Sequence, residues 1–400
     1  MSSPQNQRFT SVLPWILFIT VMVFFGIMPR VLLAPLLLRM SADLGISYDR
    51  ASLFFLSSSA GFVTGLFSSG FVAQKLTHKW TIVASVLLAG IALVLLSRVT
   101  TVAGFHLLLF AGGWANGLYP GSGIAAVTTI AQDMHRGKAL AVHECGPNLA
   151  FILAPVLAAA IAPAWGWRGV TLAVGAGAVF SAIAFAAFGH ATAGRGQPPS
   201  FRNVAALARN RSFWVMSALF MVVFTAASGV YGVLPTYLIV EHGLTERFVN
   251  NLVGASRIAG FVSILSAGSL ADRFGFRRVV TVILVVTGSV TLLLGIANGW
   301  LLVASVFMQP MIVGAFFPVG LSALADVTSP ERRNLAIALA IPLANIVGAG
   351  LAPPLFTAAG ARGWFPQAFI VLGIFVVASV LLLPIMGRPR ETVIPADDPA

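Results

Sequence analysis

Charged residues are scarce in this 400-residue chain, at 9%, and cysteine occurs once, as Cys145. A soluble globular domain carries about 25% charged residues. Hydrophobic residues here reach 58%, and the mean hydropathy is +0.93. These values exclude an ordinary soluble protein and indicate a polytopic membrane protein that lies in a lipid bilayer. A lone cysteine excludes an intramolecular disulfide and a cysteine metal cluster.

Motifs of several function classes are also missing. No Walker motif is present, so ATP is not the energy source. No Ser/His/Asp set or metal-ligand spacing predicts an enzyme, a bound metal or a cofactor. The net charge of +12 would fit a nucleic-acid partner, but most of the basic residues fall in short loops between apolar runs. We interpret them as topology signals and expect no nucleic-acid partner.

Long apolar runs organise the chain. A membrane-spanning helix needs about 20 apolar residues, and the first run is too long for a signal-peptide core, so we expect an uncleaved span. The longest polar gap, 191–211, is a predicted linker between six-helix halves at 1–190 and 212–400. We predict an all-α membrane protein, and we expect it to be a monomer. Cutting at charges, Gly/Pro pairs and polar clusters gives twelve spans, approximately 12–38, 50–74, 80–98, 102–130, 138–163, 167–189, 212–240, 247–271, 279–297, 300–326, 334–358 and 365–387.

Lys and Arg distribute unequally between the two sets of loops. With both termini on one side, that side holds sixteen of the 24 basic residues and the other side holds six. Such a bias indicates that the richer side is cytoplasmic. We therefore predict cytoplasmic termini, a cytoplasmic linker and location in the inner (plasma) membrane. The two remaining arginines, Arg30 and Arg257, lie inside predicted spans.

The two halves repeat at a constant offset of 198 residues. Two six-helix halves related by a parallel repeat are an arrangement known from secondary transporters. The offset relates four pairs, Gly45 with Gly243, Gly70 with Gly268, Pro120 with Pro318, and Pro155 with Pro353.

A basic motif follows the eighth span and reads Gly268-Ser-Leu-Ala-Asp272-Arg273-Phe-Gly275-Phe-Arg277-Arg278. It resembles the G-x-x-x-D-R-x-G-R-[RK] signature of the major facilitator superfamily, whose fold has two halves of six transmembrane helices. In that family the stronger copy follows the second helix, whereas Gln74 and Lys75 stand here where Asp and Arg would be. The resemblance implies a secondary transporter in which the motif is a conformational latch and not a substrate site.

Arg30 and Arg257 are the strongest candidates for a substrate site. Charges within a span are costly and face the bundle interior or a water-filled cavity. At 1.5 Å per residue, both lie about 13–15 Å from the outer helix ends. The repeat places Ser228 and Ser59 at the matching positions, so the scaffold requires neither arginine. No acid lies at their depth, so the pair favours an anion, above all a carboxylate that accepts paired N–H donors.

Two branches of the superfamily carry arginines in similar places. The eighth-helix arginine resembles that of the oxalate/formate and monocarboxylate branches, where it binds the substrate carboxylate. The first-helix arginine resembles that of organophosphate and organic-anion porters. The alternative is structural: each arginine snorkels, or pairs with backbone carbonyls and with Tyr231 or Asn116.

Glu144 is the acidic residue that lies well inside a predicted span, about 9 Å from the cytoplasmic end, with His143 beside it. A carboxyl group in apolar surroundings and a histidine can both exchange a proton near neutral pH. Either is a candidate carrier of a coupling proton. The alternative for Glu144 is a buried carboxylate that pairs with a basic residue and holds an inner gate. Adjacent helical positions point about 100° apart, so the two side chains are not expected to share a face.

Neutral polar residues complete the predicted substrate site. The resemblance implies that helices 1, 4, 7 and 10 line the pathway. Asn116 and Tyr119 are three residues apart and share a helix face, so we expect them to contact the substrate. The other candidates are Tyr231, Gln309 and Asn345. For each residue, packing or a buried hydrogen bond is the alternative.

The sequence therefore predicts a transporter that moves a small organic anion, a carboxylate, by alternating access with proton symport. A proton-driven exporter of drugs or amphiphiles is the alternative within transport. It is favoured by the Phe-rich spans and by Cys145-Gly146-Pro147-Asn148, which loosely resembles a Gly-Pro motif of exporters. A non-transporting membrane sensor on the same scaffold is the alternative of another class.

Overall fold

The computed structural model describes residues 9–131, 133–190, 194–196, 207–326 and 333–386, without the side chains of 133, 261–269, 272, 325–326 and 333–334. Its elements are helical, with π-helices at η2 and η4 and 3-10 helices at η1 and η5. In order they are α1 (Phe9–Val31), α2 (Leu33–Asp43), α3 (Tyr48–Ala51), α4 (Leu53–Leu96), α5 (Val102–Gly117), α6 (Tyr119–Ile130), η1 (Asp133–His135), α7 (Arg136–Phe188), α9 (Arg211–Phe224), η2 (Thr225–Gly229), α10 (Val230–Val240), α11 (Glu246–Phe274), α12 (Phe276–Ile296), α13 (Gly299–Val313), α14 (Phe316–Asp326), α15 (Arg333–Asn345), η4 (Ile346–Leu351), α16 (Ala352–Gly360), α17 (Phe365–Ala378) and η5 (Ser379–Ile385).

These elements form twelve membrane crossings in the described part of the chain. Eight helical stretches are long and apolar enough to span a membrane, and α5–α6 and α11 form two further crossings. Two of the eight, Tyr48–Leu96 and Arg136–Phe188, hold two crossings each, because the backbone leaves the helical conformation at Thr77 and at Gly166. The crossings are numbered 1 (α1–α2), 2 (α3 and α4 to 76), 3 (α4 from 78), 4 (α5–α6), 5 (α7 to 165), 6 (α7 from 167), 7 (α9–η2–α10), 8 (α11), 9 (α12), 10 (α13–α14), 11 (α15–η4–α16) and 12 (α17–η5).

The break at Thr77 is a chain reversal. Gly65 lies against the backbone of Trp114, and Ser85 Oγ donates a hydrogen bond to the carbonyl of Ala115 at 2.7 Å. A straight helix would separate Gly65 from Ser85 by about 30 Å. Crossings 2 and 3 must therefore run antiparallel to reach the same turn of α5.

The turns between crossings reproduce the 198-residue repeat. Gly45 and Gly243 have φ angles of 63° and 62°, and Thr77 and Gly275, also 198 residues apart, have φ angles of 71° and 83°. Positive φ suits glycine, but it is an outlier for a β-branched residue. Thr77 therefore carries backbone strain that Gly275 avoids at the equivalent turn.

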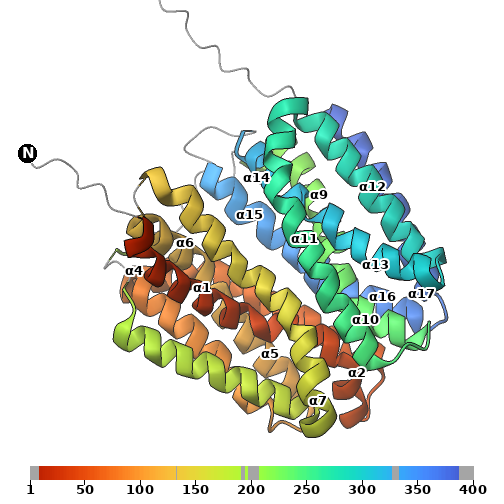
Figure 1. Cartoon of the computed structure of the whole chain (residues 1–400), viewed down its shortest axis with the longest axis horizontal. Helices are drawn as coiled ribbons and strands as arrows, with labels where there is room; N and C mark the ends of the chain where they lie inside the picture. The colour runs from red at the N-terminus through yellow and green to blue at the C-terminus, as the bar shows by residue number, and fades with distance from the viewer. Residues whose placement is uncertain (1–8, 132, 191–193, 197–206, 327–332, 387–400) are drawn as a thin grey trace, which may run out of the picture.

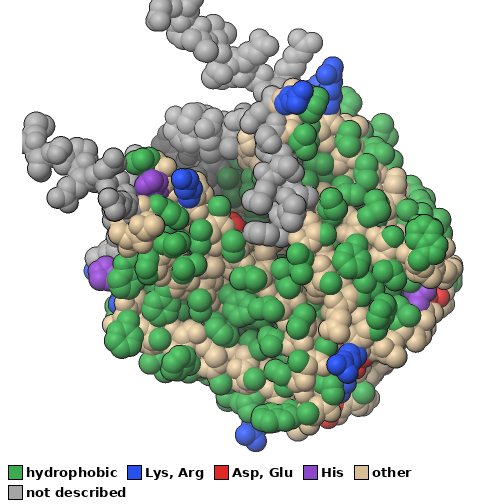
Figure 2. All heavy atoms as spheres, viewed as in Figure 1, with side chains coloured by type: hydrophobic (Ala, Val, Ile, Leu, Met, Phe, Trp, Pro, Cys, Tyr) green, Lys and Arg blue, Asp and Glu red, His purple; other side chains and the backbone are tan. Residues whose placement is uncertain are grey.

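The two halves meet at one end of the bundle and separate toward the other. Figure 1 shows them converging near α2 and α10 and diverging toward α6 and α14. We name the converging end the closed end and the other, which carries Lys75, Arg136 and Arg273, the basic end. In Figure 2 the Lys and Arg side chains of the visible face gather at its ends, and the surface between them is largely hydrophobic. This distribution is that of a bundle surrounded by lipid.

Crossings 2 and 11 form one contact between the halves, named the 2–11 seam. Thr357 Oγ1 donates a hydrogen bond to Ser52 Oγ at 2.7 Å. Farther from the closed end, a Cβ added at Gly350 would lie 2.9 Å from the Cβ of Ser59. Such an approach is possible only because residue 350 is glycine, so the seam is tightly closed as far as the middle of the bundle.

Crossings 5 and 8 form the second contact, named the 5–8 seam, with α2 beside it. Arg39 Nε donates to the carboxylate of Glu246 at 2.7 Å and Arg39 Nη1 to the carbonyl of Ala162 at 3.3 Å. A Cβ added at Gly254 would lie 3.0 Å from the carbonyl oxygen of Ile152. The two seams together close the space between the halves on the closed-end side.

Candidate functional site

Arg30 stands in the last turn of α1, directly after Pro29. Its Nη2 donates a hydrogen bond to Oδ1 of Asn345 at 2.9 Å, and its Cζ lies 4.2 Å from the ring centroid of Phe62. Arg30 and Phe62 belong to the first half and Asn345 to the second. This guanidinium therefore lies at the interface between the halves.

Arg257 lies in the middle of α11, with its side chain among aromatic rings. Its Cζ is 4.7 Å from the ring centroid of Tyr231 and 5.8 Å from that of Phe151. Its Nε is buried and has no hydrogen-bond partner among the described residues. A cation over an aromatic face is stabilised by about 0.5–2 kcal/mol. The ring contact thus holds the guanidinium in place, and the Nε donor has no partner in the described part of the chain.

Tyr231 of crossing 7 connects the surroundings of the two arginines. Its ring contacts Arg257 and packs edge-on against Phe151, with centroids 4.8 Å apart. Its hydroxyl donates a hydrogen bond to the carbonyl of Val31, the residue after Arg30, at 3.4 Å. Tyr231 therefore contacts the guanidinium of Arg257 and the backbone next to Arg30.

No carboxylate pairs with either guanidinium among the described residues. Partly buried positive charge without a counter-ion is costly, and a planar guanidinium suits an anion with two acceptor oxygens. The arrangement can therefore hold an anion. The ion pairs in the described part of the chain are Arg39 with Glu246, Arg168 with Asp43, and His143 with Glu144.

Two π-helices, η2 and η4, lie beside the two arginines, and they were not expected from the sequence. η2 and η4 pack together through glycines, since a Cβ added at Gly229 would lie 2.7 Å from the carbonyl oxygen of Gly348. η4 begins directly after Asn345. Gln309 of crossing 10 donates from Nε2 to the carbonyl of Ala226 in η2 at 2.5 Å. A π-turn leaves backbone groups free and recurs at functional sites; the paired glycines were the signal that sequence reasoning had available.

Asn116 and Tyr119 are engaged by crossing 1. α5 ends at Gly117 and α6 begins at Tyr119, but Leu118 between them keeps a helical backbone, and both side chains face α1. Asn116 Nδ2 donates to the carbonyl of Gly26 at 2.7 Å, and Tyr119 Oη donates to that of Ile19 at 3.1 Å. Both side chains are buried. In this structure they hold crossing 1 against crossing 4 and do not contact the arginines.

His143 and Glu144 form a short chain with Tyr119 on crossing 5. His143 Nε2 lies 3.0 Å from Tyr119 Oη, and His143 Nδ1 lies 3.2 Å from Glu144 Oε1. The side chain of His143 is 4% exposed and that of Glu144 is 60% exposed. The two side chains lie in different surroundings, as expected for adjacent positions about 100° apart on a helix, but they contact each other. The exposure of Glu144 corrects both the apolar surroundings expected for its carboxyl and the alternative of a buried carboxylate, because its position on α7 leaves the carboxyl at the surface.

The motif that follows α11 forms a sharp turn at the basic end. Gly275, with φ 83°, separates α11 from α12. Arg277 Nη2 donates to the carbonyl of Met386 at 2.7 Å, which ties this turn to crossing 12, and Arg273 and Arg278 are exposed. The surroundings of Gly268 and the side chain of Asp272 lie outside the described part of the structure.

The twelve crossings form two repeated halves that meet at the closed end, with polar side chains between the halves. This arrangement is that of a membrane transporter. The chain belongs to the Major Facilitator Superfamily, which it matches over residues 17–266 and 241–399. It is accordingly a multi-pass membrane transporter that takes a small-molecule substrate, and not an enzyme.

Individual relatives are distant in sequence. An uncharacterized MFS-type transporter of Bacillus subtilis (strain 168), YfkF, is 25% identical over 169 residues, which span 40% of this chain and 40% of that relative. A bacterial homolog of the human lysosomal transporter Spinster, inward-facing and occupied, has a TM-score of 0.78 at 13% identity and covers 96% of this chain and 98% of its own. A mutant of the nucleoside transporter NupG has a TM-score of 0.78 at 16% identity, with 93% and 99% covered. The two structures share the fold with this chain.

Proposed function

We propose that this transporter moves a small organic anion, a carboxylate, bound between Arg257 and Arg30. The observation that carries the proposal is two guanidiniums at the interface of the halves with no acidic partner among the described residues. Arg257 Nε is buried and has no hydrogen-bond partner among the described residues, so a carboxylate would meet an unused donor there. Arg30 already donates to the neutral oxygen of Asn345, which an anionic oxygen would replace with a stronger, charge-assisted bond.

The two seams define how such an anion would move. They close the space between the halves from the middle of the bundle to the closed end, so the site in this conformation is approached from the basic end. Transport requires the seams to part and the basic ends to come together. An anion that contacts Arg30 in one half and Arg257 in the other favours the conformations in which both arginines face it, because it binds those conformations best.

Substitution of the arginines by lysine tests the anion site. Lysine keeps the charge but loses the planar pair of donors, so Arg257→Lys and Arg30→Lys should each reduce uptake of small labelled carboxylates into proteoliposomes by about tenfold or more. Arg247→Lys, an exposed change on the same helix as Arg257, is the matched control. Normal transport by both lysine variants would disprove the anion site. Competition by a lipophilic cation would instead favour an exporter of drugs or amphiphiles.

We further propose proton symport through Tyr119, His143 and Glu144. The single proton of Tyr119 Oη points to the carbonyl of Ile19, which only accepts, so His143 Nε2 donates to Tyr119. The contact between His143 Nδ1 and Glu144 then needs one more proton, held by either residue. Glu144 is exposed and exchanges that proton with water. Loss of the proton breaks the contact, which links proton release to crossings 1, 4 and 5.

Separation of net uptake from exchange tests the proton site. Glu144→Gln and His143→Gln should abolish accumulation driven by a pH gradient and leave substrate counterflow intact, because exchange moves no net proton. Glu241→Gln, at the closed end and exposed, is the control. Gradient-driven accumulation at the wild-type level in both variants would exclude the proposal.

We propose that the basic end faces the cytoplasm of a cell with an inner (plasma) membrane, and that one chain is sufficient. The excess of Lys and Arg at that end supports the orientation, and both halves of the site come from the same chain. A cysteine placed at Arg136 in a Cys145→Ser background should resist a membrane-impermeant thiol reagent in intact cells. Labelling from outside would reverse the orientation.

A further inference from the structure

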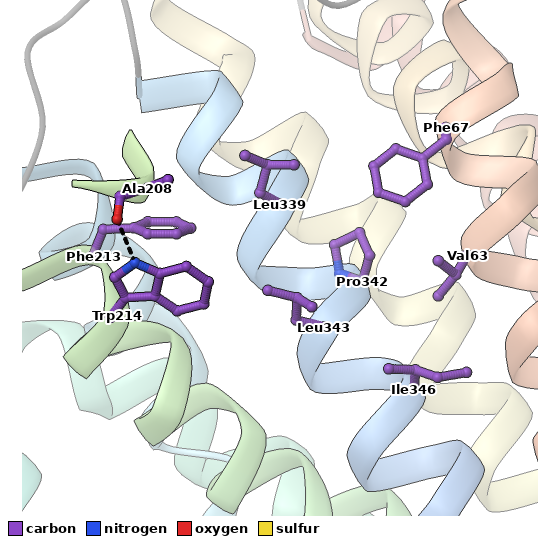
Figure 3. A pocket seen from close by; sticks show the side chains of 9 residues that line it. All are labelled: Val63, Phe67, Ala208, Phe213, Trp214, Leu339, Pro342, Leu343 and Ile346. Carbon is purple, nitrogen blue, oxygen red and sulfur yellow. Dashed lines mark hydrogen bonds between the residues drawn. The ribbon is translucent and has the colours of Figure 1, made fainter. Parts of the chain in front are cut away.

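An apolar groove lies between the halves on the basic-end side of the 2–11 seam (Figure 3). Its volume is about 270 Å³. The one side-chain polar atom of its lining, Trp214 Nε1, already donates to the carbonyl of Ala208 at 2.8 Å. The groove therefore offers no side-chain donor or acceptor to an occupant. It is lined by Val63, Phe67, Ala208, Phe213, Trp214, Leu339, Pro342, Leu343 and Ile346.

The groove continues the register of the seam. Crossings 2 and 11 are antiparallel, and their contacts pair residue numbers of constant sum, 409, as in Ser52 with Thr357 and Ser59 with Gly350. The same sum pairs residues 63 and 346, and then 67 and 342, all of which line the groove. The helices are in their tightest contact at residues 59 and 350, and the groove opens beside them over the following turns. The groove is thus the space left where the two halves part.

The inner edge of the groove adjoins Arg30. Val63 directly follows Phe62, whose ring lies under the Arg30 guanidinium, and Ile346 directly follows Asn345, which accepts the Arg30 hydrogen bond. The Arg30 guanidinium therefore lies near one edge of the groove, whose lining itself carries no charge. This pattern complements a molecule with an anionic head and an apolar tail.

We infer that the transported anion is amphiphilic, with its carboxylate at Arg30 and Arg257 and its alkyl chain in this groove. The inference rests on the proposed anion site and adds a tail to its substrate. An apolar cavity of about 150 Å³ accepts benzene, so the groove holds a chain of roughly ten carbons. Each methylene moved from water into it should tighten binding by about fourfold.

Trp214 supplies a local reporter. The chain has eight tryptophans, so the difference between wild type and Trp214→Phe isolates the groove signal. Bromodecanoate should quench wild-type fluorescence saturably, and Trp214→Phe should remove that saturable part. Decanoate should compete, and decanol, which lacks the charge, should compete at least about tenfold less well. Two results would overturn the inference: quenching that does not saturate, or competition by decanol that equals competition by decanoate. Either would mean that the groove takes alkyl chains without regard to charge, as lipid does.

A filled groove separates this inference from the anion site itself. Leu339→Phe occupies the groove, whereas Leu355→Phe, on the same crossing and 69% exposed on the outer surface, is the matched control. Leu339→Phe should keep acetate binding, measured by thermal shift, and lose the advantage of decanoate over acetate. Equal affinity for acetate and decanoate in wild type would overturn the amphiphilic substrate alone. Failure of carboxylates of every length to bind would overturn the proposed anion site as well.

Discussion

The two seams are equivalent by the repeat, but they use their middle level differently. Ser59 and Gly350 are in close contact in the 2–11 seam, and the offset of 198 carries them onto Arg257 and Ile152 of the 5–8 seam. There the arginine turns toward the rings of crossings 5 and 7. One seam therefore has two small residues where the other has a guanidinium. The fold determines the path of the helices and leaves this level free for either tight closure or binding.

The difference extends toward the closed end. Ser52 and Thr357 form a buried hydrogen bond in the 2–11 seam. Their equivalents by the offset are Asn250 and Ala159. Asn250 is fully buried, and neither of its amide atoms has a partner among the described residues. Unmet buried polar groups are destabilising, so we expect the 5–8 seam to open more readily than the 2–11 seam.

A covalent lock across the 2–11 seam should have the largest effect. Ser52 and Thr357 oxygens lie 2.7 Å apart, so Ser52→Cys with Thr357→Cys, in a Cys145→Ser background, should form a disulfide on oxidation. Transport should then fall to background and recover with a reductant. The single variant Ser52→Cys is the control. Full transport by the cross-linked protein would show that this seam does not need to part.

Methyl groups added at the seams should have the next largest effect, and they should distinguish one seam from the other. Gly350→Ala meets the Ser59 side chain, and Gly254→Ala meets the carbonyl of Ile152. Each should weaken closure by about 1–3 kcal/mol, seen as faster labelling of a cysteine at residue 52. Ser59→Gly should rescue Gly350→Ala, because the clash is with a side chain. A backbone clash has no such rescue, and failure of Ser59→Gly to help would contradict the contact described for the 2–11 seam.

Removal of polar groups should have opposite signs in the two seams. Asn250→Leu replaces an unpaired buried amide and should raise the free energy of unfolding by about 1 kcal/mol or more. Ser52→Ala removes one partner of a buried hydrogen bond and should lower it by about 1 kcal/mol. Thermal unfolding in detergent measures both. A loss of stability in Asn250→Leu would mean that the amide has a partner in the protein as it stands in the membrane.

The ion pair between Arg39 and Glu246 should have the smallest effect. Their side chains are 34% and 29% exposed, and such pairs contribute about 0.2–1 kcal/mol. A double-mutant cycle with Arg39→Ala and Glu246→Ala, read by the same cysteine labelling, should give a coupling in that range that weakens with salt. Coupling well above it would make this pair the main closure of the 5–8 seam.

Sequence reasoning located the crossings well because they depend on long apolar runs and on turn residues. The predicted span 247–271 lies within α11, Glu246–Phe274, and the predicted break between 163 and 167 contains the turn at Gly166. The repeat anticipated the matched turns at Gly45 and Gly243. Each of these features is local along the chain, so a single sequence carries it.

The site was harder because side-chain partners come from distant crossings. Rarity of charge singled out Arg30 and Arg257, and Tyr231 and Asn345 were among the predicted neutral residues, but the sequence could not assign Asn345 to Arg30 or place the Tyr231 ring under Arg257. Asn116 was expected to contact substrate, and in this structure its amide bonds to the backbone of crossing 1, a partner about 90 residues away along the chain. Two further features depend on backbone detail that hydrophobic periodicity does not record. They are the π-helices and the contact between His143 and Glu144.

The paired π-helices have a mechanical consequence. By the 198-residue offset, η2 and η4 correspond to residues 27–31 and 148–153 of the first half. Pro29 lies within the first of these ranges, and Pro147 directly precedes the second. A proline and a π-turn both remove regular hydrogen bonds from a helix. Crossings 1, 5, 7 and 11 therefore each lose regular helical hydrogen bonds near the level of the arginines, so the helices of both halves can bend there.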